Sequence, residues 1–175
     1  MIHTAHNCKG RLSRYLNGYK HQPVLTAHLD HLPDKPFSQE TVNEIVLWKV
    51  NRYALLPPDV RGSLHALRAL SPKKHRKGEQ VLLRLLDCDG VDLAMASTFL
   101  RFQNAEVFQI IDRHAYRAVF GQPYPLHSKA SAKTKMSTYF TYLDALHSLA
   151  ASKGAAFRDL DRILYIFDKR HNGTL

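Results

Sequence analysis

Gly90, Val91 and Asp112 are the residues whose types and spacing could do chemistry. Gly90 and Val91 lie between two predicted helices, and a glycine in such a turn lets a phosphate approach the backbone amides at the N-terminus of the second helix. Asp112 follows the glycine by 22 residues and stands at the start of another predicted helix. It could present a carboxylate beside the same phosphate-bearing chain that the turn binds. Alternatively, it is a plain N-cap that stabilises its helix by about 1 kcal/mol.

A basic charge balance favours a polyanionic partner. The 25 lysines and arginines outnumber the 15 acidic residues, so the formal net charge at pH 7 is +10. Such a surface neutralises phosphates and steers anions toward itself. A basic run just before the first helix of the turn is expected to contact phosphates, namely Lys73, Lys74, Arg76 and Lys77. The alternative for this run is a solvated loop.

Apolar periodicity predicts an all-α protein, and no segment alternates convincingly with the period of a strand. Prolines interrupt residues 1–36, which are expected to form an irregular arm. Ser38 is expected to cap the first clear helix, and Gly121 and Gly154 to end later ones. The last helix is expected to bury an apolar stripe of Leu160, Ile163, Leu164 and Phe167. Helices are predicted at 38–54, from Pro58, at 79–86, 93–102, after Asp112, at about 131–152 and at about 158–170.

Composition excludes several classes of protein. No apolar run approaches 18 residues, which argues against a membrane span, and the first residues lack the apolar stretch of a signal peptide. Two cysteines cannot form a disulfide framework, so a cytoplasmic protein is expected. The histidines at 28 and 31, with His3, His6 and Cys8 nearby, match no strong zinc pattern, and no metal is expected.

Trp48 and Lys49 are candidates for lining a pocket. Lys49 lies on the apolar stripe of the helix at 38–54, where burial could lower its pKa and make it a nucleophile or base. Alternatively, its stem covers apolar surface while its amine reaches water. Trp48 could stack on a base, or it could simply belong to the core.

The stretch from Glu79 to Phe120 resembles the helix–hairpin–helix DNA glycosylase superfamily, which includes the endonuclease III-like and adenine-mismatch glycosylases. That superfamily has a leucine-rich helix, a hairpin of the form L-P-G-V-G, a helix with small residues and an apolar strip ending in V-D-T-H-x-x-R. The resemblance covers about 42 residues closely and 38–125 loosely. The matching residues are Leu86, Gly90, Val91, Ala96, Ile111, Asp112, Arg113, His114 and Arg117.

The resemblance implies removal of a base from double-stranded DNA by a monomeric enzyme without a cofactor. Asp112 would stabilise the positive charge on the sugar as the N-glycosidic bond breaks. The base would be flipped into a pocket, for which Trp48, Lys49, His114 and Arg117 are candidates. Bifunctional members carry a lysine where this chain has Ala94, so water would be the nucleophile. Two cysteines also cannot supply the iron–sulfur loop of some members.

The implied architecture has two lobes with a cleft between them. One lobe is a helical bundle at 38–125, with the helix–hairpin–helix at about 79–102. The arm at 1–37 and the terminal segment 126–175 would form the second lobe.

The hairpin is acidic, because Asp87, Asp89 and Asp92 surround the turn. Three carboxylates oppose an anion, so either Asp92 caps its helix and faces away, or the hairpin binds DNA poorly. The acidic turn favours a first alternative, a nucleic-acid-binding module that does not cleave. A second alternative is a helical scaffold for protein interactions.

Overall fold

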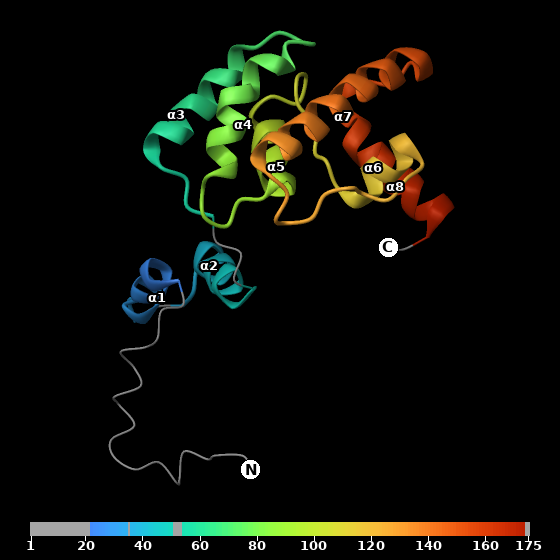
Figure 1. Ribbon diagram of the computed structural model, residues 1–175. Coiled ribbons are helices and arrows are strands. Elements are labelled where there is room, and N and C mark those ends of the chain that lie inside the picture. The colour runs from blue at the N-terminus through green and yellow to red at the C-terminus, as the bar shows by residue number, and fades with distance from the viewer. Residues whose placement is uncertain (1–21, 35, 51–53, 174–175) are drawn as a thin grey trace, which may run out of the picture. The chain divides into compact units, whose positions relative to one another are not determined.

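The computed structural model describes residues 22–34, 36–50 and 54–173, and every regular element in these ranges is a helix (Figure 1). The all-α prediction is therefore confirmed. Contacts divide the chain into two units, Met1–Tyr53 and Ala54–Leu175. This boundary differs from the expected division, since residues 126–175 belong to the same unit as the helices at 79–120, and the helix after Ser38 belongs to the other unit.

In the described part of the first unit, the helices α1 (Pro23–Asp30) and α2 (Gln39–Val50) pack together. The Ser38 hydroxyl oxygen accepts a hydrogen bond from the Thr41 amide at 3.2 Å, which confirms the predicted cap. Helix α1 lies where an irregular arm was expected. Pro23 is its first residue. Proline is tolerated there because an amide at the first position of a helix has no acceptor within the helix. The histidines and the cysteine that precede residue 22 are outside the described residues.

The second unit begins with helices that surround the turn. They are α3 (Pro58–Ala66), the short 3-10 helices η3 (Leu67–Ala69) and η4 (His75–Gly78), α4 (Glu79–Leu86) and α5 (Leu93–Gln103). Helices α3, α4 and α5 pack against one another. Their buried leucines, valines and alanines form one face of the core, including Leu82, Leu85, Leu93, Ala96 and Leu100.

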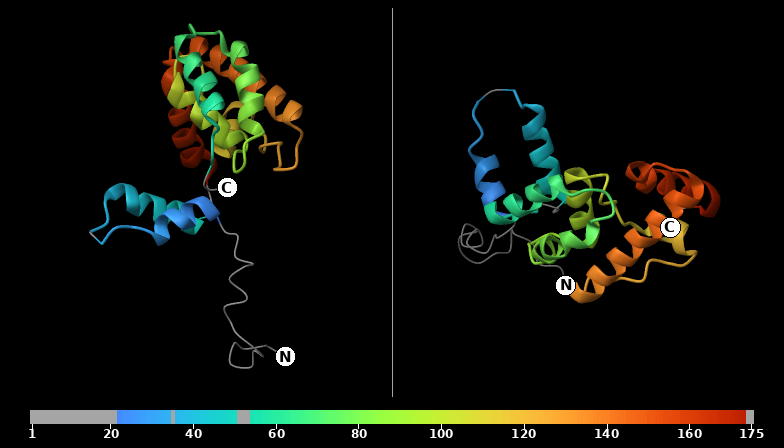
Figure 2. Two further views of the ribbon diagram at one scale, coloured as in Figure 1. Left: turned by 90° about the vertical axis from the view of Figure 1, so that its left-hand side faces the viewer. Right: turned by 90° about the horizontal axis from the view of Figure 1, so that it is seen from above.

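The rest of this unit consists of α6 (Arg113–Phe120), α7 (Ala132–Lys153), η5 (Phe157–Asp159) and α8 (Leu160–Asn172). Helix α7 lies across the unit and contacts α4, α5 and α6, as the views in Figure 2 show. The buried hydroxyls of Tyr139 and Tyr142 each donate at 2.9 Å to a backbone carbonyl, of Gln109 and of Ile110. These bonds fix the apolar strip before Asp112 against α7.

The predicted buried face of α8 is wrong in part. Leu160 and Leu164 are buried, but the side chains of Ile163 and Phe167 are 48% and 49% exposed. Asp161 and Asp168 occupy the inward face instead. The reason is that each buried carboxylate finds a cationic partner inside the unit, which a count of apolar residues along one helix cannot reveal.

Candidate functional site

The turn between α4 and α5 has the conformation that its glycine permits. Gly90 has a φ of 76°, in the left-handed region that favours glycine. The Val91 amide donates to the Cys88 carbonyl at 3.1 Å. The Val91 side chain is buried in the core while Gly90 is exposed. Valine thus anchors the turn and glycine presents the backbone to solvent.

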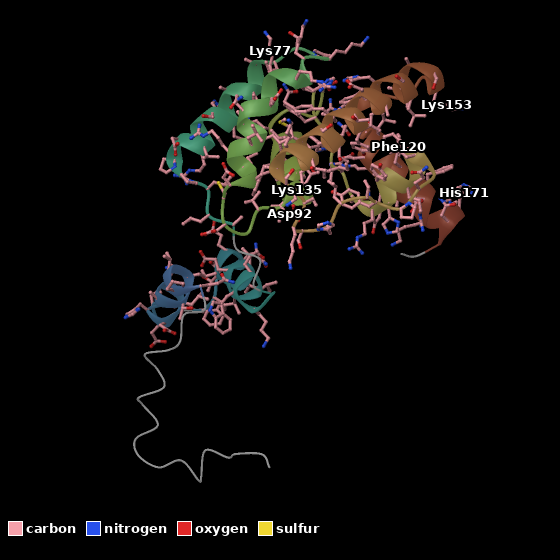
Figure 3. The ribbon with its side chains drawn as sticks, viewed as in Figure 1. Lys77, Asp92, Phe120, Lys135, Lys153 and His171 are labelled. Atoms are coloured by element: carbon pink, nitrogen blue, oxygen red, sulfur yellow. The ribbon has the colours of Figure 1, made fainter. Side chains whose placement is uncertain are left out.

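Asp92 is the N-cap of α5, as predicted. Its Oδ1 accepts from the Leu93 amide at 2.7 Å and lies 2.8 Å from the amine of Lys135 on α7 (Figure 3). Partial burial opposes ionisation of Asp92, but the hydrogen bonds from Lys135 and from the Leu93 amide outweigh it and lower the pKa of this carboxyl below its usual value. Lys135 also donates to the Ser128 carbonyl at 2.9 Å. One of the three acids of the turn is therefore already paired with a cation.

The basic run at 73–77 lies at the other end of α4 from the turn. Figure 3 shows Lys77 and Asp92 on opposite sides of the unit, and an eight-residue helix is about 12 Å long. Arg76 pairs with Asp144 at 2.5 Å, and the buried His75 ring contacts the same carboxylate at 2.8 Å. The exposed side chains of Lys73, Lys74 and Lys77 remain as cations at this end. Lys135, and not this run, contacts an acid of the turn.

Asp112 is the N-cap of α6 and also borders a pocket. Its Oδ1 accepts from the Ala115 amide at 2.7 Å, and the side chain is half-buried. The pocket has a volume of about 320 Å³. Besides Asp112, it is lined by Ile110, Asp161, Arg162, Tyr165 and Ile166.

Asp161 supplies a second carboxylate to this pocket. It is 5% exposed, and its Oδ2 lies 3.2 Å from Nε of Arg101, a guanidinium that is itself buried. Its Oδ1 accepts from the Arg162 amide at 2.7 Å. Asp161 was not predicted from the sequence, because its partner Arg101 lies on another helix, 60 residues away in the chain.

His114 and Arg117, two of the predicted pocket residues, instead bind Asp168 on α8. Asp168 is fully buried. Arg117 donates from Nε and Nη2 at 2.9 and 2.8 Å, His114 Nδ1 lies 2.7 Å from the carboxylate, and Asn172 donates at 2.7 Å. The bonds from Arg117, aided by those from Asn172 and His114, hold the pKa of Asp168 well below its usual range. Neither His114 nor Arg117 lines the Asp112 pocket.

This cluster joins α6 to α8, the two helices that pack most extensively against each other. Asp168 was not predicted from the sequence. The available signal was its helical spacing from Asp161 and Leu164, which places all three on one face of the helix.

Trp48 and Lys49 lie in the first unit, whereas Asp112 lies in the second. The indole nitrogen of Trp48 donates to the Thr26 hydroxyl at 2.9 Å, which ties α2 to α1. The Lys49 side chain is exposed. Both stay candidates for contact with a ligand.

Within residues 22–34, 36–50 and 54–173, no group of three or more histidine, cysteine, aspartate or glutamate side chains is placed to hold a metal ion. Over the same ranges, no helix combines the length and the apolar character that crossing a membrane requires. Comparison of the chain with known protein families, curated proteins and solved structures found no match.

Proposed function

We propose that this protein binds DNA and removes a base by hydrolysing its N-glycosidic bond, with Asp112 as the catalytic carboxylate. The observation that carries the proposal is the position of Asp112. Its side chain is fixed by the cap of α6 and lines a pocket of about 320 Å³, and a helix–turn–helix with a left-handed glycine precedes it in the chain.

In this proposal the Ala115 amide orients the carboxylate, which stabilises the oxocarbenium-like sugar as the base departs. The base enters the pocket, where the Tyr165 ring offers a stacking surface. The exposed backbone at Gly90 contacts a phosphate of the same strand. Ala94, exposed on the first turn of α5, cannot form a Schiff base, so water completes the reaction.

The pairing of Asp92 with Lys135 supports DNA binding at the turn. The sequence offers three carboxylates there, and this pair compensates the charge of one of them. The remaining two, Asp87 and Asp89, are exposed. A phosphate bound at Gly90 therefore meets less repulsion than the sequence alone suggests.

The test is an abasic-site assay on duplexes that each carry one damaged or mismatched base. Wild-type protein is expected to release at least one base, and Asp112→Asn to lose about 100-fold or more of the rate. Asparagine caps a helix as well as aspartate does, so this variant keeps α6 intact and removes only the charge. Ser131→Ala, which removes the cap of α7, is the control for a general loss of helix stability and is expected to release bases at the wild-type rate.

Two results would overturn the enzymatic proposal. One is that wild-type protein leaves every lesion untouched. The other is that Asp112→Asn releases bases at the wild-type rate.

A second candidate function, binding of nucleic acid without cleavage, is favoured by the Asp168 cluster. Two residues of the matched motif, His114 and Arg117, are engaged in holding α8. In this case duplex binding is expected to weaken steeply with salt while no base is released. If duplex binding does not depend on salt, the nucleic-acid-binding function is excluded, and a scaffold for protein interactions becomes the remaining candidate.

A further inference from the structure

The outward face of α8 combines exposed apolar side chains with cations. Ile163, Ile166 and Phe167 are 48%, 56% and 49% exposed and lie on one stripe of the helix. Arg162 precedes this stripe, and Arg170 follows it. Together with His171 these side chains line a shallow pocket of about 450 Å³. Exposed apolar patches with a polar rim mark interaction sites.

The charges of α8, which the structure describes in full, are sorted by face. Its two acids, Asp161 and Asp168, are buried and paired inside the unit. The side chains of Arg162, Lys169 and Arg170 are exposed. The outward face therefore presents only positive formal charge, and its electrostatic complement is an anion.

This face is continuous with the Asp112 pocket. Arg162 and Ile166 line both pockets, so a ligand chain that passes from one to the other stays in contact with α8. Arg162 and Arg170 are eight residues apart, about 12 Å along the helix axis, and the apolar stripe lies between them. The arrangement suits a chain that carries regularly spaced negative charges and flat apolar groups.

We infer that the outward face of α8 binds an unpaired nucleic-acid strand, with phosphates on Arg162 and Arg170 and bases against Ile166 and Phe167. A duplex displays its phosphates but hides the faces of its bases, so it would leave the apolar stripe uncovered. An unpaired strand offers both groups, and stacking on aromatic side chains beside a positive groove is the usual mode of single-strand binding.

The choice of nucleic acid over an acidic protein rests on the proposed function, through the continuity with the Asp112 pocket. The inference goes further than that function, because it assigns a single-strand site to a helix outside the matched motif.

The test is fluorescence anisotropy of labelled oligothymidylate and of a duplex of equal length, with the full chain. Phe167→Ala is expected to weaken single-strand binding about fivefold or more. Arg170→Gln is expected to weaken it and to reduce the slope of log K against log salt by about 0.7. Neither variant is expected to weaken duplex binding to the same extent.

Two matched controls separate the face from general effects. Phe102→Ala removes a phenyl that is 70% exposed on α5, and Arg61→Gln removes one exposed charge from α3. Both should bind oligothymidylate as wild type does. Circular dichroism of each variant checks that the helices remain.

Wild-type affinity in both α8 variants would overturn the inference, and so would equal losses in the controls. Polyglutamate of matched charge is the competitor for the other class of partner. If it displaces oligothymidylate as effectively as unlabelled oligothymidylate does, the face recognises acidic chains in general, and the assignment to a nucleic-acid strand fails.

The assays separate this failure from that of the proposed function. If wild-type protein releases a base but the α8 variants bind single strands as wild type does, the inference about α8 is wrong and the proposed function stands. Loss of single-strand binding in these variants, with no base released from any lesion, removes the enzymatic proposal alone.

Discussion

The two faces of α8 differ from those of an ordinary amphipathic helix, because each face combines charged with apolar side chains. The inward face buries Asp161 and Asp168, whereas the outward face exposes Ile163, Ile166 and Phe167. Burial of a carboxylate is tolerated only where cations and hydrogen-bond donors surround it, and Arg101 and Arg117 meet that need. The inward face therefore holds its charges among cations, while the outward face leaves its apolar side chains in contact with solvent.

The largest effect is expected from Asp168→Ala on the inward face. It leaves Arg117 and His114 without their shared carboxylate, and removal of one partner from a buried ion pair costs about 3–5 kcal/mol. Urea unfolding followed by circular dichroism measures the loss. Lys169→Ala, one residue further along and exposed, is the matched control and should change stability by less than about 0.5 kcal/mol. Equal stability of both variants would mean that the Asp168 cluster does not hold α8.

The second effect is a loss of stability in acid. The folded pKa of Asp168 lies below its unfolded value, so this group stabilises the fold above about pH 4, and its contribution is lost as the pH falls further. Urea midpoints measured between pH 7 and pH 3 should fall for the wild type and fall less for Asp168→Asn. The variant should retain some dependence of the urea midpoint on pH, because the pKa of Asp92 is also lowered in the folded protein. If the urea midpoints of the wild type and of Asp168→Asn fall equally between pH 7 and pH 3, Asp168 is not the source of the acid sensitivity.

A third, smaller effect is expected where α6 meets the Asp112 pocket. Asp112→Ala removes the N-cap and should lower the free energy of unfolding by about 1 kcal/mol, whereas Asp112→Asn should change it by only a few tenths. Thermal unfolding of the two variants tests this order. If asparagine destabilises as much as alanine, the negative charge of Asp112, and not its hydrogen bond to the helix, stabilises the start of α6. The base-release assay then needs a different variant.

The smallest effect is expected on the outward face. Ile166→Ser should change stability by less than about 0.5 kcal/mol, because this side chain is 56% exposed. Urea unfolding measures this as well. A large destabilisation would show that the stripe is covered in the folded protein, and the contrast between the two faces of α8 would then disappear.

The sequence predicted the elements that depend on neighbouring residues. Helix α4 has the predicted bounds, and Ser38, Asp92 and Asp112 each accept the expected backbone hydrogen bond at the start of a helix. Gly121 has the left-handed conformation expected at a helix end. Caps and helix ends follow from sequence because the groups that satisfy them lie within about four residues along the chain.

Contacts between distant residues were decided only by the tertiary structure. Lys135 reaches Asp92 from another helix, and Asp168 binds His114 and Arg117 across more than fifty residues of sequence. The pairs of Asp168 with Arg117 and of Asp161 with Arg101 determine which face of α8 is buried, against the expectation from its apolar residues. Apolar periodicity indicates which face of a helix is suited to burial. The free energy of burying a charge on that face depends on the cations and hydrogen-bond donors that neighbouring helices place there.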